Sequence, residues 1–186
     1  MSTEDGLARV TYLPGARPPE PAAPDGKRKS GSTRAVSIRA LTRRDLSRWE
    51  LEQTLRARDL EDDAIAEELG RLEAAGLIDD AALAEMLVRT RHERKGLSRS
   101  ALAAELRRRR VDQQHIDAAL TQIDDEDERA TARSLAATRA RRLQGLDQET
   151  AARRLSSFLA RKGYSSDVVR AAVKEALPQG LGVHFD

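Results

Sequence analysis

The chain has 186 residues, of which 39% are hydrophobic, 34% are charged and only 3% are aromatic. It contains no cysteine, which excludes disulfides and thiolate metal sites, and its three scattered histidines form no ligand cluster. Because no apolar run reaches the roughly 18 residues of a membrane helix and no signal core opens the chain, we expect a cytoplasmic protein.

The net charge of +2 hides an uneven distribution. Acidic residues dominate residues 45–85, whereas basic residues dominate residues 89–110 and 139–162. This segregation is typical of a surface that faces a polyanion or an acidic protein groove. A solvated helix face would give the same pattern, so charge alone leaves both interpretations open.

The first region is rich in proline. Residues 1–36 hold five of the six prolines and few apolar side chains. Such a composition cannot offset the entropy cost of ordering, so we expect a disordered arm. Order is expected from about Val36, with a short helix over residues 39–45.

The rest of the chain repeats one apolar spacing three times. Steps of four place residues on one helix face, and the two central steps of five suit a short turn. Each copy is therefore predicted to be helix, tight turn, helix. The three copies are Leu51, Leu55, Leu60, Ile65 and Leu69, then Leu102, Leu106, Val111, Ile116 and Leu120, then Leu155, Leu159, Tyr164, Val169 and Val173.

Polar residues at the predicted helix starts have a structural explanation. Ser47 and Glu50 are spaced as a capping box, and Asp79 and Asp80 precede a helix predicted from residue 81 to about 95. These two aspartates could serve acid–base chemistry, and the acidic run at residues 124–128 could hold a metal, but helix capping accounts for both.

These elements predict an all-α fold, an elongated curved array of three tandem three-helix repeats of helix-turn-helix type. Each triplet is too small to bury its apolar face well alone, so we expect neighbouring repeats to stack. The predicted divisions are the arm, the three repeats and a tail, over residues 1–36, 37–78, 79–124, 125–178 and 179–186.

Three stretches resemble the RecX family, whose members regulate the bacterial RecA recombinase. Residues 44–55 are similar to the family's R-x-x-S-x-x-E-L-x-x-x-L, and residues 76–84 are similar to its G-x-[IL]-D-D-x-x-[FL]-A. The third stretch is the repeated spacing itself, which ends with Lys-Gly-Tyr at residues 162–164. The resemblance covers roughly residues 38–177.

The chain also departs from the family pattern. The family often has glycine at the turn of each repeat, whereas Asp59 and Arg110 occupy this place in the first two copies and only Gly163 fits. Leu83 stands where many members have phenylalanine. The first departure leaves the geometry of two turns open.

The resemblance implies a non-enzymatic modulator, mainly an inhibitor, of RecA. Family members lie in the groove of the RecA filament on single-stranded DNA and suppress ATP hydrolysis and strand exchange, which regulates recombination, DNA repair and the SOS response. The implied partner is the RecA filament, with single-stranded DNA as a further candidate. We expect no catalytic residue, metal, cofactor, membrane or small-molecule substrate, and we expect a monomer.

The alternative is a general nucleic-acid-binding helical module, based on the basic runs alone. Trp49, Phe158 and Tyr164 are expected in the core, which weakens recognition by base stacking. An enzyme is not expected, because the sequence contains no nucleophile with a base, no phosphate-binding glycine loop and no metal set. In either binding function, the candidate residues are Arg89, Arg91, Arg94, Lys95, Arg107, Arg108, Arg109, Arg110, Arg139, Arg141, Arg142, Arg161 and Lys162.

Overall fold

The computed structural model describes residues 26–177. Most of the expected arm and the tail therefore lie outside the described residues. Within them, the chain forms nine α-helices and one short 3₁₀ turn, η1 (Arg141–Leu143). The helices are α1 (Gly26–Leu41), α2 (Arg48–Arg56), α3 (Asp62–Ala74), α4 (Asp80–Lys95), α5 (Arg99–Arg108), α6 (Gln113–Leu120), α7 (Asp125–Ala140), α8 (Gln148–Arg161) and α9 (Ser166–Ala176).

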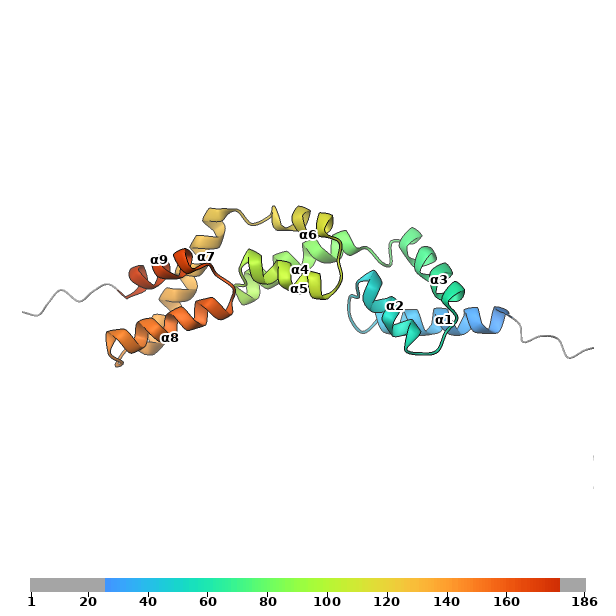
Figure 1. Ribbon diagram of the computed structural model, residues 1–186, viewed down its shortest axis with the longest axis horizontal. Coiled ribbons are helices and arrows are strands. Elements are labelled where there is room, and N and C mark those ends of the chain that lie inside the picture. The colour runs from blue at the N-terminus through green and yellow to red at the C-terminus, as the bar shows by residue number, and fades with distance from the viewer. Residues whose placement is uncertain (1–25, 178–186) are drawn as a thin grey trace, which may run out of the picture.

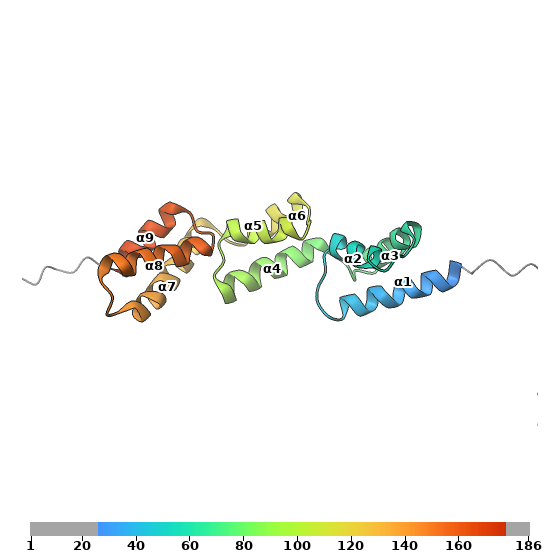
Figure 2. The ribbon, with the colours of Figure 1, turned by 60° about the horizontal axis from the view of Figure 1, so that its bottom comes forward.

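The helices are grouped in threes along one axis. Figures 1 and 2 show α1–α3, α4–α6 and α7–α9 as three units placed end to end, so that the molecule is elongated and gently curved. In each unit, a lead helix packs against the two helices of the repeated spacing. The predicted all-α array of three-helix repeats is thereby confirmed.

The predicted caps begin the helices. Ser47 and Glu50 form the capping box of α2. Side chains of Asp79, Ser98 and Asp124 accept hydrogen bonds from backbone amides at the starts of α4, α5 and α7. Capping therefore uses the carboxylates of Asp79 and Asp124 in the way that the sequence predicted.

The turn inside each repeat keeps one conformation with or without glycine. The middle residues of the three turns, Asp59, Arg110 and Gly163, have φ of 53°, 59° and 88°. A left-handed conformation costs a residue other than glycine roughly 1–2 kcal/mol. The first two turns therefore keep the geometry of the third turn in spite of a local strain.

The first helix begins earlier than the sequence predicted. α1 spans Gly26–Leu41, so it includes residues expected in the disordered arm and replaces the short helix expected from residue 39. Ser37 is fully buried, and its hydroxyl donates to Glu68 Oε1 on α3 at 2.5 Å. The guanidinium of Arg71 donates to both oxygens of Glu68 at 2.8 Å. The apolar spacing misses this anchor because the anchor is polar and joins residues far apart in sequence.

The apolar positions form three separate cores. The fifteen residues of the repeated spacing lie in three clusters, one inside each repeat, and twelve of the fifteen are buried. The expectation that a triplet depends on its neighbour to bury its apolar face was wrong, because the lead helix covers the face within the same repeat. Some apolar contact does cross between repeats, because Leu83 of α4 is buried outside these clusters and lines one cleft with Ile38 and Leu41 of α1.

At the first junction, the start of α2 meets the turn after α5. The hydroxyl of Ser47 donates to the backbone carbonyl of Arg109 at 2.7 Å. The amide of Arg48 donates to the carboxylate of Asp80 at 2.9 Å. Burial raises the pKa of Asp80, while this hydrogen bond from the Arg48 amide opposes the increase. Polar groups therefore hold the first and second repeats together.

At the second junction, the start of α5 meets the turn after α8. The amide of Ser98 donates to the carbonyl of Lys162 at 3.0 Å, and the amide of Arg99 donates to the carboxylate of Glu128 at 2.9 Å. The buried hydroxyl of Tyr164 donates to the Gly96 carbonyl at 3.0 Å. Both junctions thus use the N-terminus of one repeat's middle helix against the turn of the next repeat.

We predict that Gly163→Ala weakens the second junction. A Cβ at this position would lie 2.5 Å from Ser98 Oγ and 2.8 Å from Ala101 Cβ, so the turn would have to withdraw. Gly145→Ala is the matched control, because Gly145 also has positive φ but has open space around it. Urea unfolding should show a free energy of unfolding lower by roughly 1–3 kcal/mol for Gly163→Ala than for Gly145→Ala. Equal losses would contradict the close approach.

We also predict that Glu68 makes the stability of the chain depend on pH. The hydrogen bond from Arg71 lowers the pKa of Glu68, against the opposing effect of burial. A carboxyl with a lowered pKa stabilises the fold above its unfolded pKa, and this contribution disappears as the pH falls through the folded pKa. Glu68→Gln should therefore unfold more readily than the wild type at neutral pH, by about 1–2 kcal/mol, and the difference should shrink in acid.

Thermal unfolding from pH 7 to pH 3 measures this effect, with Glu67→Gln as the exposed neighbouring control. A difference between wild type and Glu68→Gln that stayed constant over this range would refute the linkage.

Candidate partner-binding surface

The thirteen predicted basic residues lie on the second and third repeats. Those of the second repeat are on the later half of α4, at the end of α5 and in the turn that follows α5. Those of the third repeat are at the end of α7, in η1, and at the end of α8 with its turn. Contacts within the chain distinguish these residues from one another.

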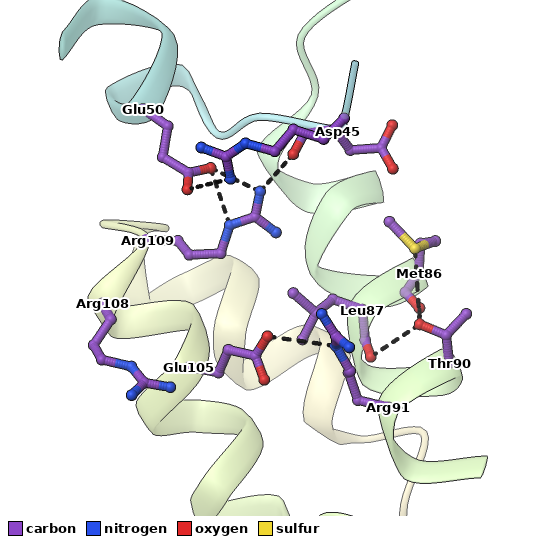
Figure 3. Close-up of a pocket in the computed structure, with 10 residues that line it drawn as sticks. Asp45, Glu50, Met86, Leu87, Thr90, Arg91, Glu105, Arg108 and Arg109 are labelled. Carbon is purple, nitrogen blue, oxygen red and sulfur yellow. Dashed lines mark hydrogen bonds and ion pairs between the residues drawn. The ribbon is translucent and has the colours of Figure 1, made fainter. Parts of the chain in front are cut away.

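Arg109 belongs to the fold. Its side chain is only 17% exposed, and Nη2 and Nε lie 2.7 Å and 3.0 Å from Glu50 Oε2. Nη2 also donates to the carbonyl of Asp45 at 2.7 Å (Figure 3). Burial alone would raise the pKa of Glu50, but hydrogen bonds from Arg109 and from the Ser47 amide outweigh it and hold this pKa below its usual range. Arg109 is therefore a clamp between repeats, not a free cation.

A charged cleft of about 520 Å³ adjoins this clamp. Arg91 lies on one wall, with Nε 3.4 Å from Glu105 Oε1 on the opposite wall. Figure 3 shows Arg108 at the edge of the cleft, without an interaction to the other residues drawn. Sequence reasoning missed Glu50 and Glu105 as cleft residues, because only the capping-box role of Glu50 has a local signal. Most of the charge in this cleft is neutralised internally.

Two of the predicted cations lie over one ring at the second junction, and two more line the cleft that this ring borders. The Cζ of Arg139 and the Nζ of Lys162 each lie 5.3 Å from the ring centroid of Phe158, in cation–π geometry. Arg94, Lys95, Phe158 and Lys162 line a cleft of about 820 Å³ there. We call Arg94, Lys95, Arg139, Phe158 and Lys162 the Phe158 cluster.

Positive charge is concentrated in the Phe158 cluster. Burial, together with the neighbouring charge of Lys95, lowers the pKa of Lys162. The ammonium of Lys162 also donates to the backbone carbonyl of Lys95, which ties the third repeat to the second. Among the described residues, Arg94, Lys95 and Arg139 form no ion pair. The cluster can therefore receive an anionic group without first breaking an internal salt bridge.

The remaining predicted residues are exposed and lie apart from the Phe158 cluster. Arg107 donates to Gln113 at 3.2 Å, and Arg141 donates to Thr138 at 3.4 Å. The described contacts pair four others with no acidic group, namely Arg89, Arg108, Arg142 and Arg161. These residues are available at the surface, but no contact joins them to one site.

The aromatic residues differ from the core positions that the sequence predicted. Tyr164 is buried, as expected, but Trp49 is 40% exposed and Phe158 is half-buried. The guanidinium of Arg110 lies 5.9 Å from the ring centroid of Trp49. The ring of Trp49 is therefore accessible, whereas Phe158 packs against the core of the third repeat with two cations of the Phe158 cluster over its ring. No helix in residues 26–177 has the length and apolar character needed to cross a membrane.

Comparison with known proteins relates the sequence and the fold to one family. Family models of RecX match two of the repeats: the second three-helix domain over residues 79–120 and the third three-helix domain over residues 125–173. A solved structure of RecX from Lactobacillus salivarius has a TM-score of 0.70 and 23% identity, covering 81% of this chain and 97% of that chain. This likeness supports the fold.

Two related proteins share more than 40% of their aligned residues with this chain. The chain is 44% identical over 130 residues to the regulatory protein RecX of Streptomyces coelicolor, covering 70% of this chain and 69% of that protein. It is 41% identical over 137 residues to the regulatory protein RecX of Thermobifida fusca, covering 73% of this chain and 74% of that protein. The chain therefore belongs to the RecX family of regulatory proteins.

Proposed function

We propose that the protein is a non-enzymatic modulator, mainly an inhibitor, of the RecA recombinase, and that it binds in the groove of the RecA filament on single-stranded DNA. The observation that carries this proposal is the elongated array with unpaired cations on its second and third repeats. A filament on DNA offers a long surface of repeating units and phosphates. A rigid array of repeats can contact several of these units at once.

The distribution of charge suits such a partner. The first repeat is acidic, whereas the second and third repeats present the exposed arginines and the Phe158 cluster. Alternating patches of charge fix the orientation and register of a complex more than its raw affinity. We infer that the cations face acidic filament surface or DNA phosphates, and that bound protein suppresses ATP hydrolysis and strand exchange. The cellular consequence would be control of recombination, DNA repair and the SOS response.

The direct test is a titration of RecA-catalysed, single-strand-dependent ATP hydrolysis with this protein at fixed salt. Inhibition is expected well below one molecule per RecA, because one bound molecule would act on many protomers. Absence of inhibition, at concentrations where the chain binds naked single strands, would overturn the proposal. That outcome would favour a general nucleic-acid-binding module, for which the accessible ring of Trp49 is the specific observation.

We predict that reversing charge in the Phe158 cluster weakens this inhibition. Arg94→Glu, Lys95→Glu and Arg139→Glu together should raise the inhibitory concentration roughly tenfold, since attraction becomes repulsion. Helical content measured by circular dichroism should stay unchanged, because these three side chains form no internal ion pair in the described chain.

The matched control reverses three exposed arginines outside the predicted set, Arg43, Arg58 and Arg129. It makes the same change in net charge at other places on the array. If both triple variants inhibited equally, net charge would explain the effect and the Phe158 cluster would not be the contact.

A further inference from the structure

An apolar groove lies at the first junction, between the end of α1 and the start of α4. It has a volume of about 500 Å³, and its apolar walls come from Ile38, Leu41, Leu77, Leu83 and Met86. We call these five residues the apolar groove. It contains none of the predicted partner-binding residues. Its walls are apolar, whereas the Phe158 cluster is cationic.

The groove leaves large side chains in contact with water. Leu77 is 57% exposed and Ile38 is 46% exposed, whereas Leu51 and Leu55 in the adjacent core are fully buried. Exposed leucine and isoleucine on facing walls of one cleft form a contiguous apolar patch. Covering such a patch removes apolar surface from water and lowers the free energy, so the patch is a candidate binding surface.

The fold does not require leucine at position 77. Ile78 and Ile123 occupy the same place at the two junctions and are 5% and 4% exposed. Each is followed by an aspartate that caps the next lead helix. The residue before each isoleucine differs, since it is Leu77 at the first junction and Gln122 at the second. The fold therefore accepts a polar residue, Gln122, at the equivalent position of the second junction. Packing within the chain does not explain the leucine at position 77.

The charges of the two junctions also differ. The corresponding cleft at the second junction is lined by three cations, Arg94, Lys95 and Lys162, and by two carboxylates, Glu93 and Asp127. The charged residues that line the cleft around the apolar groove are Asp45 and Asp79. The Asp79 carboxylate caps α4, while the Asp45 carboxylate is exposed and makes no interaction with the described residues. An occupant with an apolar stripe and adjacent Lys or Arg would complement both features.

The walls of the groove are helical ridges. Ile38 and Leu41 are three residues apart on α1, and Leu83 and Met86 are three residues apart on α4. Ridges of this spacing accept the side chains of another helix. The described residues offer no strand edge to pair with an extended peptide, so an occupant must satisfy its own backbone hydrogen bonds, as a helix does.

We propose that the apolar groove binds an amphipathic helix of a partner protein, whose apolar stripe covers Leu77 and Ile38 and whose basic side chains approach Asp45. This contact is additional to the proposed filament contact of the Phe158 cluster and does not need DNA. It gives the first junction a binding role of its own, separate from the Phe158 cluster at the second junction.

The test uses a fluorescein-labelled helical peptide with leucines at i, i+3, i+4 and i+7 and lysines beside them. Its binding to the full chain is measured by fluorescence anisotropy without DNA. Leu77→Ser should weaken binding roughly tenfold, as loss of a central apolar contact does. Leu146→Ser is the matched control, because Leu146 is a 39% exposed leucine in the third repeat, and it should leave binding unchanged.

Two further measurements test the charge. Asp45→Asn, which keeps the apolar walls, should weaken binding of the lysine peptide. A peptide with glutamate in place of lysine should bind the wild type more weakly than the lysine peptide. No binding of the lysine peptide, equal effects of Leu77→Ser and Leu146→Ser, or equal binding of the two peptides would overturn the proposal.

Other occupants give different results. A dimer seen by sedimentation velocity in the wild type and lost in Leu77→Ser would mean that a second copy covers the groove. Tighter peptide binding after Leu7, Val10 and Leu13 are replaced by serine would mean that the chain's own first residues cover it. Either result would overturn the assignment to a partner helix.

Discussion

The arrangement of the molecule depends on one contact that is made twice, between the start of a repeat's middle helix and the turn of the next repeat. Ser47 donates its hydroxyl to the carbonyl of Arg109, and Ser98 donates its amide to the carbonyl of Lys162. Because the three hydrophobic clusters each lie within one repeat, these polar contacts and their neighbours contribute much of what sets how the repeats lie relative to one another. The array is thus three small folding units joined by directional hydrogen bonds.

Two of the three turns within the repeats make this contact, and all three turns share one geometry. The turns of the second and third repeats present the carbonyls of Arg109 and Lys162 to the preceding repeat, and in both turns the next residue is left-handed. Arg110 has a positive φ although it is not a glycine. Gly163 lies so close to Ser98 that a Cβ at position 163 would clash with the Ser98 hydroxyl. At the first repeat, Asp59 adopts the same conformation although no described repeat precedes it.

The junctions also decide which charges remain for partners. At the first junction, Arg109 forms an ion pair with Glu50 and is not available to a partner. The adjacent groove is apolar, with Asp45 and Asp79 at its edge. At the second junction, Arg139 and Lys162 lie over the ring of Phe158, and Arg94 and Lys95 line the adjoining cleft. Two clefts at equivalent places in the array therefore differ in chemistry, because the residues that line them are not those that repeat in the core.

The sequence predicts what depends on local periodicity. The spacing of four, five, five and four residues gives each helix pair, and Ser47 with Glu50 gives a helix start, because these signals lie within a few positions. It misses the early start of α1, since Ser37 and Glu68 are 31 positions apart. It also treats Arg109 as a free cation, because its partner Glu50 is 59 positions away. Exposure of Trp49 has no local signal either.

The central claim is that polar junctions hold three independent cores in a fixed array. The chain lacks cysteine, so spin labels can be placed at Ala57Cys in the first repeat and Ala137Cys in the third, both at exposed positions. Double electron–electron resonance should give one narrow distance distribution in the otherwise unchanged chain. Adding Ser47→Ala and Arg109→Gln should broaden it while helical content persists. A distribution that is broad from the start, or one that stays narrow after both changes, would contradict the account.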